Sequence, residues 1–205
     1  MTLHVADSPI NVYRPALGEP RNRFTVAATA LDAATPPAPP RTRVERTNHL
    51  TIDAPEPLRG LLVRVPDGVA LTVDARRGDV AVTDITGSVD VRTGAGDVRI
   101  LVPGVAQAAT GSGHLSVTMG SAQWNGTLRY SSGNGDVEVW INENAQFVAH
   151  LRTDDGTLFT DFGLRGVSNG TIEQIDGPVN GGAMRAIDIH VLKGNIRLLR
   201  LHPEA

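Results

Sequence analysis

The chain contains no cysteine among its 205 residues. This absence excludes disulfide bonds, thiolate metal sites and a cysteine nucleophile. Aromatic residues make up only 4% of the sequence, which favours a core of small aliphatic side chains over one built on large rings. The net charge of −3 is too small to indicate a nucleic-acid partner or an anionic membrane surface.

Long hydrophobic runs are also absent. The apolar run at 102–109 is interrupted by Pro103, Gly104 and Gln107 and falls far short of a membrane span. Residues 1–9 have neither the basic region nor the apolar stretch of a secretory signal. The sequence as given therefore predicts a cytoplasmic protein without a membrane span. An extracellular or cell-surface location is the alternative if the chain has been trimmed from a longer protein.

Glycine and proline are plentiful, with 22 and 13 residues, and they punctuate one short phrase that recurs along the chain. The clearest copies are Thr93–Ile100 (TGAGDVRI) and Ser132–Val139 (SGNGDVEV). Looser copies occur at 77–82, 111–117, 154–158 and 193–198. Each copy is a glycine-bearing turn followed by a short segment with alternating apolar positions, which predicts a turn and a strand.

Apolar and polar residues alternate through most of the chain after residue 43. Val69, Leu71 and Val73 share one face of such a segment, and Arg99 and Glu138 are examples of the polar opposite face. This pattern is typical of strands with one face in a core and the other in water. The predicted strands are 10–13, 23–30, 44–53, 61–65, 69–73, 80–82, 89–91, 98–100, 115–119, 128–130, 137–141, 187–191 and 196–198. A short helix at 25–31 is the alternative for the second of these.

The spacing of the turn glycines indicates the architecture. The glycines at 78, 87 and 96 are evenly spaced, and the later ones lie at 113, 126, 135, 156 and 194. The spacing corresponds to a repeat of about 18–22 residues, which is the length of a β-solenoid coil. We therefore predict an all-β fold, a β-solenoid of short coils. A β-sandwich is the alternative, but it does not require successive copies of one phrase.

The proline-rich stretch at 35–40 marks the main predicted break in the chain. We predict an N-terminal arm or cap at 1–43 and a solenoid domain at 44–205. The stretch 159–180 departs from the repeat and is interpreted as a longer excursion or a final irregular coil. Solenoid ends expose unpaired strand edges, so the N-terminal segment and the tail at 200–204 are candidates for covering them.

The tandem Gly-Asp-Val phrases, together with residues 151–156 and the closing segments 176–182 and 194–198, resemble the bacterial “putative adhesin” domains. The similarity covers residues 44–201 of this largely uncharacterised family of β-solenoid proteins. It implies a right-handed, stacked β-helical fold and brings no catalytic residues. One departure is Leu192-Lys193, which replaces the family's second turn glycine before Gly194 and implies a different turn in the last coil.

Four aspartates at or near the repeated turns are the strongest candidates for chemistry. They are Asp79, Asp97, Asp136 and Asp155, and a solenoid would align them along one edge. A carboxylate row can bind Ca²⁺, and a pair of carboxylates can hydrolyse glycosidic bonds. The alternative is turn chemistry, in which aspartate tolerates the left-handed conformation and hydrogen-bonds its own backbone. Copies with His114, Thr157 and Asn195 at the matching place favour the turn role.

The histidines and tryptophans give weaker signals. The histidines are His4, His49, His114, His150, His190 and His202, without the close spacing of a metal site, so we predict scattered surface residues. Ser112 and His114 lack the context of a nucleophile elbow and are interpreted as a turn. Trp140 is predicted on the outer face beside Glu138. Trp140 and Trp124 either stack on a sugar or a protein partner, or are covered by other segments.

These observations favour a non-catalytic structural or interaction protein with an unknown protein or glycan partner, or with self-association through the solenoid ends. The alternative is a carbohydrate-active enzyme that uses aspartates on the solenoid wall. No catalytic, cofactor-binding or metal-binding residue is assigned, and no cofactor is expected.

Overall fold

The computed structural model describes residues 1–15, 24–29, 41–45, 49–54, 59–182 and 184–202, with the backbone alone for 42–54. The described residues form strands and connecting turns without a helix. The strands are β1 (Thr2–Asp7), β2 (Ile10–Tyr13), β3 (Thr25–Thr29), β4 (Arg41–Glu45), β5 (His49–Ala54), β6 (Gly60–Arg64), β7 (Leu71–Arg77), β8 (Val80–Thr83), β9 (Val89–Thr93), β10 (Val98–Val102), β11 (Ala106–Thr110), β12 (Leu115–Met119), β13 (Gly126–Asn134), β14 (Val137–Asn142), β15 (Phe147–Thr153), β16 (Leu158–Thr160), β17 (Gly166–Asn169), β18 (Ile172–Val179), β19 (Arg185–Lys193) and β20 (Ile196–Leu201).

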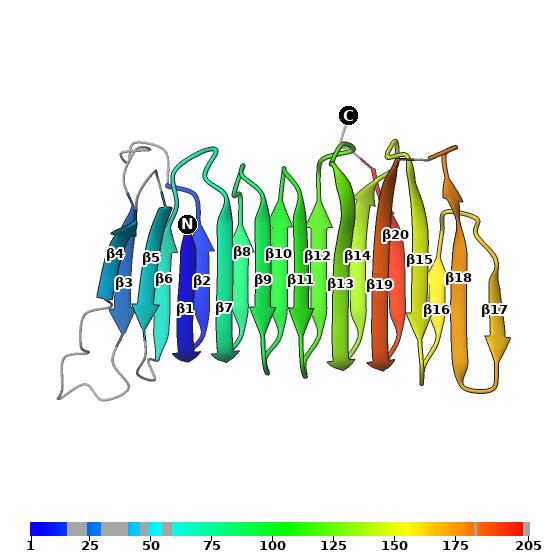
Figure 1. Ribbon diagram of the computed structural model, residues 1–205, viewed down its shortest axis with the longest axis horizontal. Helices are drawn as coiled ribbons and strands as arrows, with labels where there is room; N and C mark the ends of the chain where they lie inside the picture. The colour runs from blue at the N-terminus through cyan, green and yellow to red at the C-terminus, as the bar shows by residue number, and fades with distance from the viewer. Residues whose placement is uncertain (16–23, 30–40, 46–48, 55–58, 183, 203–205) are drawn as a thin grey trace.

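The strands form two long sheets that lie face to face, as Figure 1 shows. Sheet A has eleven strands in the order β17-β18-β15-β19-β13-β11-β9-β7-β1-β5-β4, and sheet B has nine in the order β16-β20-β14-β12-β10-β8-β2-β6-β3. Each coil contributes one strand to each sheet. We call the edge at which the chain passes from sheet A to sheet B the lower edge, and the opposite edge the upper edge. The all-β, solenoid-like fold expected from the sequence is confirmed, and no sandwich is needed to explain it.

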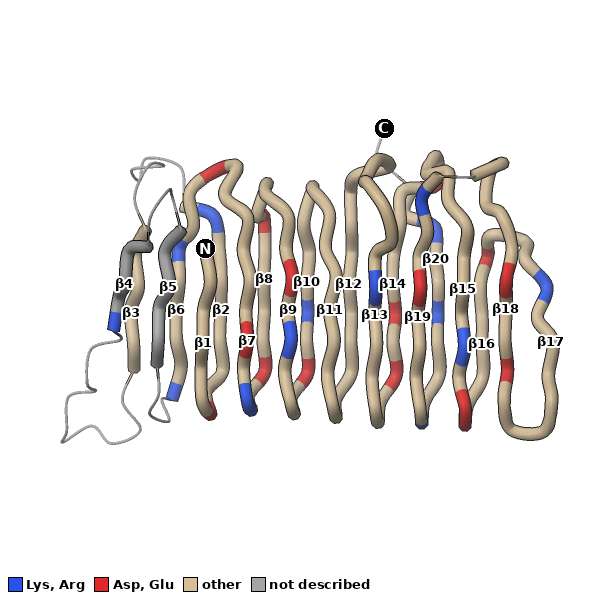
Figure 2. The backbone as a smooth tube through the Cα atoms, viewed as in Figure 1, with Lys and Arg blue, Asp and Glu red and all other residues tan. Residues whose placement is uncertain are grey.

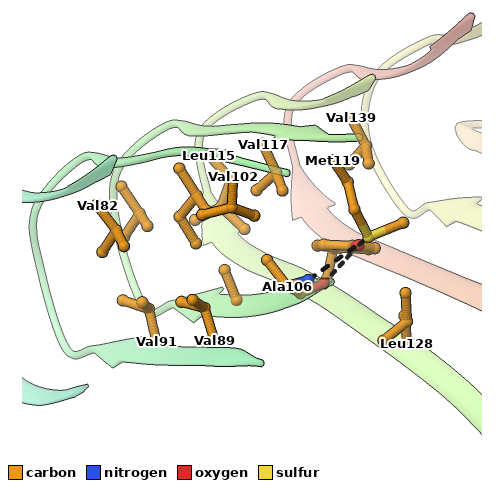
Figure 3. Packing of buried hydrophobic residues seen from close by; sticks show 14 of the residues in the cluster. Val82, Val89, Val91, Val102, Ala106, Leu115, Val117, Met119, Leu128 and Val139 are labelled. Carbon is orange, nitrogen blue, oxygen red and sulfur yellow. Dashed lines mark hydrogen bonds between the residues drawn. The ribbon is translucent and has the colours of Figure 1, made fainter. Parts of the chain in front are cut away.

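Like residues stack on like residues in successive coils. Val98 pairs with Val80 on one side and with Leu115 on the other, and Leu115 pairs with Val137. The inward side chains of both sheets fill the space between them, where Val82, Val117 and Val139 are fully buried (Figure 3). Small branched side chains suit this narrow interior because each must interlock with the facing sheet. The scarcity of aromatic residues is thus explained by the thickness of the core.

The two ends of the chain are threaded into the stack rather than placed at its extremities. The N-terminal pair β1 and β2 lies between β5–β6 and β7–β8, and the C-terminal pair β19 and β20 lies between β13–β14 and β15–β16. Antiparallel strands occupy both ends: β3 and β4 at one, and β17 and β18 at the other. The predicted excursion at 159–180 therefore corresponds mainly to a hairpin that extends sheet A.

Several sequence-based expectations need correction. The predicted single strand at 44–53 is divided between β4 and β5, which pair with each other antiparallel. Strands β1, β11 and β15 were not predicted, because β11 is an alanine-rich segment and the other two lie outside the glycine phrases. Strands β17 and β18 were not predicted either, because they lie in the stretch 159–180 that departs from the repeat. Residues 2–13 are interior strands rather than part of an arm, whereas β3 and β4 lie where a cap would. The proline-rich segment at 35–40 lies outside the described residues.

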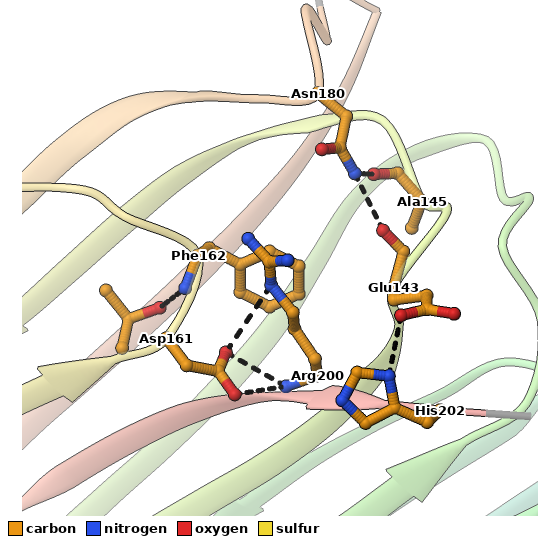
Figure 4. Close-up of polar contacts among 8 residues, drawn as sticks. Glu143, Ala145, Asp161, Phe162, Asn180, Arg200 and His202 are labelled. Atoms are coloured by element: carbon orange, nitrogen blue, oxygen red, sulfur yellow. Dashed lines mark hydrogen bonds and ion pairs between the residues drawn. The ribbon is translucent and has the colours of Figure 1, made fainter.

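Polar contacts tie the C-terminal end of the stack together at the upper edge (Figure 4). The amide of Asn180 donates hydrogen bonds of 2.8 Å to the carbonyls of Glu143 and Ala145. The guanidinium of Arg200 lies 5.1 Å from the ring centroid of Phe162, and its backbone N–H donates to Asp161. The Asn180 contacts hold the turn after β18, and the Arg200 contacts hold the segment that leads from β16 to β17, against the body of the stack.

Candidate functional site

The repeated glycine phrase forms the lower edge of the stack. Its turn glycines share a backbone conformation with φ between +121° and +159°. They are Gly78, Gly96, Gly113, Gly135, Gly156 and Gly194. A Cβ atom on Gly96 would lie 2.2 Å from the carbonyl oxygen of Gly78, so a side chain there is excluded by contact with the neighbouring coil as well as by conformation. Gly194 has φ of +142°, like the other turn glycines, and the expected difference at Leu192-Lys193 stays a prediction.

The side chain that follows each turn glycine joins one coil to the next. Oδ1 of Asp79 accepts a 2.9 Å hydrogen bond from the backbone N–H of Asp97, and Oδ1 of Asp97 accepts one of 2.8 Å from His114. Nδ1 of His114 accepts from Asp136, Oδ1 of Asp136 from Asn195, and Oδ1 of Asn195 from Thr157, at 2.8 to 3.1 Å. Figure 2 shows acidic residues along this lower edge. The prediction of an aligned edge is confirmed for Asp79, Asp97 and Asp136.

This geometry corrects the expected hydrogen bonding. The predicted turn role assigned each aspartate to its own backbone, whereas the structure shows it accepting from the next coil. Asp155 does not belong to the row, because Thr157 occupies the matching place, and the backbone carbonyl of Asp155 instead accepts from Gly194. A carboxylate, an amide and an imidazole all serve in the row, so an acceptor atom is the shared requirement. Within the described ranges, no group of three or more acidic or histidine side chains is arranged to hold a metal ion.

Buried hydroxyl groups complete the lower edge, and the sequence analysis missed their role. Thr110, Ser132 and Thr153 face the core and are at most 5% exposed. Their hydroxyls donate to the carbonyls of the neighbouring turn glycines Gly96, Gly113 and Gly194 at 2.8 to 3.1 Å. Such a bond satisfies a carbonyl that would otherwise be left in an apolar environment. The signal for it was a Ser or Thr three residues before the turn glycine in each of these copies.

The remaining described histidines lie on the outer surface, mostly beside carboxylates of neighbouring strands. On sheet A, His150 Nδ1 is 2.7 Å from Asp176, His190 is 3.6 Å from Asp154 and His4 is 3.5 Å from Asp74. His202 contacts Glu143 at 2.6 Å, near the upper edge. The expectation of dispersed surface histidines fits these positions, and the side chain of His49 lies outside the described residues.

Two of these carboxyl groups are more acidic than usual. The hydrogen bond from His150 holds the pKa of Asp176 below its ordinary value. The hydrogen bond from Arg152 similarly lowers the pKa of Asp154. Both carboxylates are largely exposed, so these pairs make small contributions to stability.

The two tryptophans have different environments. Trp140 lies on the outer face of β14 as predicted, and its indole N–H donates a 2.8 Å hydrogen bond to Glu138. Trp124 is only 6% exposed and packs on Phe147, whose ring contacts Phe162 from the segment before β17. Trp124 is therefore a core residue of the upper edge rather than a surface for stacking sugars.

Comparison with known proteins identifies the family. The sequence model described as Toastrack DUF4097 matches residues 63–199, which is more than half of the chain. The chain belongs to this family. No curated protein matches it.

One solved structure resembles the Toastrack chain along nearly its whole length. It is described as a “putative cell adhesion protein” from Clostridium sporogenes ATCC 15579. The TM-score is 0.52 and the sequence identity 10%, over 98% of this chain and 91% of that one. At this identity the similarity shows the fold alone.

The Toastrack match begins within β6, yet the stack continues beyond it. Strands β1 and β2 precede the matched residues and still pair on both sides within the two sheets. The two-layer architecture is thus larger than the matched segment. In the part of the chain that the structure describes, no helix is long and apolar enough to cross a membrane.

Proposed function

We propose that this Toastrack protein is a non-catalytic, adhesin-like interaction protein whose outer walls bind a protein or glycan partner. The observation that carries the proposal is the use of the turn carboxylates. Asp79, Asp97 and Asp136, the side chains best placed by sequence to act as a catalytic or calcium-binding row, each accept a backbone N–H of the next coil. Because these edge carboxylates are used in hydrogen bonds between coils, we place recognition of a partner on the flat outer faces of the two sheets.

The wall of sheet A carries an open groove lined by arginines. The groove has a volume of about 730 Å³, and residues of β1, β7 and β9 line it together with Gly94. Arg41, Arg76 and Arg92 line it. Guanidinium groups present several donors in a fixed plane and recognise carboxylate, sulfate or phosphate groups. We propose that this groove takes an acidic group of the partner.

Two arginines of the groove are held in place by carboxylates. Arg76 makes a two-point contact with Asp7, at 3.2 and 2.6 Å, and Arg92 contacts Asp90 at 3.3 Å. Their side chains remain 70% and 65% exposed. Such pairs orient the guanidinium while leaving donor groups for a ligand. The structural neighbour is described as a “putative cell adhesion protein”, and an adhesion role for this chain would place it at the cell surface.

The proposal is tested by screening the purified protein against arrays of acidic and neutral glycans and immobilised extracellular proteins. We expect binding without turnover, and we expect Arg92→Glu to weaken it at least tenfold through the reversed charge. Arg197→Glu is the matched control, because Arg197 is paired with Glu138 at 3.0 Å and is similarly exposed on sheet B. Equal loss in both variants would exclude the groove, and cleavage of a bound glycan would support the enzymatic alternative instead.

A further inference from the structure

The C-terminal end of the stack is asymmetric. Each of the nine strands of sheet B is backed by a strand of sheet A, from β3 with β4 at one end to β16 with β15 at the other. Beyond β15, sheet A continues with β18 and β17, for which sheet B has no counterpart in the described residues. Figure 1 shows these two strands extending past β16. Sheet B is therefore two strand positions shorter than sheet A at this end.

The unbacked strands leave a groove beside β16. It measures about 280 Å³ and is lined by residues of β16, β17 and β18 and of the segment that connects β16 to β17. Leu158, Leu164 and Ile175 line it together with polar residues such as Ser168 and Glu173. Phe159 and Val167, on its rim, are 54% and 73% exposed. Exposed apolar side chains next to an open strand edge are typical of an interface.

We infer that this end binds the same end of a second copy of the chain. In this arrangement a two-fold axis parallel to the strands brings β17 of each copy beside β16 of the other. The two surplus strands of each sheet A then fill the two positions missing from the other copy's sheet B. The surplus and the deficit are equal in number and lie at one end, so the contact is self-complementary, as a two-fold dimer requires.

The strand directions are compatible with this pairing. Strand β18 is antiparallel to both β15 and β17, so β17 runs in the same direction as β15. Strands of sheet A and sheet B run in opposite directions, as the arrowheads of β15 and β16 show in Figure 1. Rotation about an axis parallel to the strands preserves direction, so β17 of one copy meets β16 of the other antiparallel. The inner faces of both sheets remain turned toward one continuous core.

The C-terminal end of a second copy complements this end better than the N-terminal end of a second copy would. At the N-terminal end, β3 and β4 close the two sheets at the same level, so the described strands of that end leave no two-strand gap or projection. Head-to-tail stacking would leave the gap beside β16 unfilled. The contact is independent of what the walls bind, so its failure would not affect the proposed function.

One side chain competes with the dimer. The carboxylate of Glu173 accepts a 2.8 Å hydrogen bond from the backbone N–H of Leu158 and thereby covers the edge of β16 in the single chain. Pairing with a strand of a second copy needs this edge to be open. Removal of the carboxylate should therefore strengthen the dimer, whereas a charge on the groove's rim should weaken it.

Sedimentation equilibrium of the full chain over about 1–100 µM tests the inference, a range suited to interfaces of modest size. We expect a monomer–dimer equilibrium, at least tenfold weaker for Phe159→Lys and tighter for Glu173→Ala. The matched control is Leu101→Lys, because Leu101 is 51% exposed on sheet B but lies in the middle of the stack. A wild-type chain that stays monomeric at every concentration, or equal weakening by both lysine variants, would overturn the inference.

Discussion

The lower and upper edges of the stack turn the same chain in two different ways. At the lower edge, Asp97, His114 and Asp136 each follow a turn glycine directly, and the side chain of each accepts a backbone N–H of the next coil. At the upper edge the connections differ in length, and they span 84–88, 103–105, 120–125 and 143–146. The lower edge is therefore a repeated backbone device, whereas the upper edge is adapted coil by coil.

This difference explains why the repeat period varies while the register does not. Matching lower-edge residues are 18 apart between Asp79 and Asp97, 17 apart between Asp97 and His114, and 22 apart between His114 and Asp136. The longest of these coils contains the upper connection that carries Trp124. The upper connections can differ in length because side chains fill that edge. The lower turns cannot, because their backbones are in contact with those of the neighbouring coils.

The largest effect should come from Gly96→Ala at the lower edge. The added Cβ would meet backbone atoms of Gly78 at 2.2 and 2.5 Å and would also impose a side chain on φ of +141°. We expect a loss of about 4 kcal/mol in unfolding free energy, from overpacking and backbone strain together. Urea denaturation followed by circular dichroism measures it.

The matched control is Gly126→Ala at the upper edge, where φ is +72° and no heavy atom lies within 4 Å of the added Cβ. Only the conformational term remains, so we expect a loss of about 1 kcal/mol. Similar losses in the two variants would contradict the contrast between the edges.

Trp124→Ala removes the aromatic packing of the upper edge. The expected loss of unfolding free energy is slightly smaller than that for Gly96→Ala. The ring of Trp124 lies 5.7 Å from that of Phe147, and its indole N–H donates to no acceptor among the described residues. The cost is thus one of lost packing, about 3 kcal/mol. Thermal unfolding should show a lower midpoint, while Trp124→Phe should recover most of the difference. Full stability of the alanine variant would mean that the connection at 120–125 contributes little to the core.

Substitution of Asp97 separates the acceptor from the charge. Asp97→Ala removes the acceptor for the N–H of His114, and we expect a loss of about 1 kcal/mol at this exposed site. Asp97→Asn retains Oδ1, as Asn195 does in its own coil, and should be close to neutral. Chemical denaturation of both variants measures the difference. If Asn were as harmful as Ala, the negative charge itself would be required, as in a calcium-binding or catalytic row.

The repeated parts of the fold could be predicted from the sequence. The parts that depend on which coils are neighbours in the stack could not. The Gly-Asp-Val phrases located the lower edge because glycine is demanded there by backbone contact, and alternation located most central strands. The place of β19 and β20 between β13–β14 and β15–β16 could not be read from the sequence, because Asn195 has the same phrase as any other coil. The acceptor role of the aspartates was missed for a similar reason, since adjacency of coils decides it.

The smallest expected effect on stability concerns His150 and Asp176, a pair on the outer face of sheet A that belongs to neither edge. The hydrogen bond from His150 lowers the pKa of Asp176, so this carboxylate adds stability above its ordinary pKa. That contribution is lost as the pH falls through the lowered pKa of the folded state. In His150→Gln the pKa of Asp176 should rise toward its ordinary value, and stability at neutral pH should fall by a few tenths of a kcal/mol, on the order of an exposed ion pair. Carbon-detected NMR titration of the Asp176 carboxyl measures the shift, with His4→Gln as the control that leaves it unchanged. An unaltered titration in His150→Gln would show that His150 is not the cause of the lowered pKa, and would assign that effect to Gln174, whose amide also donates to Asp176.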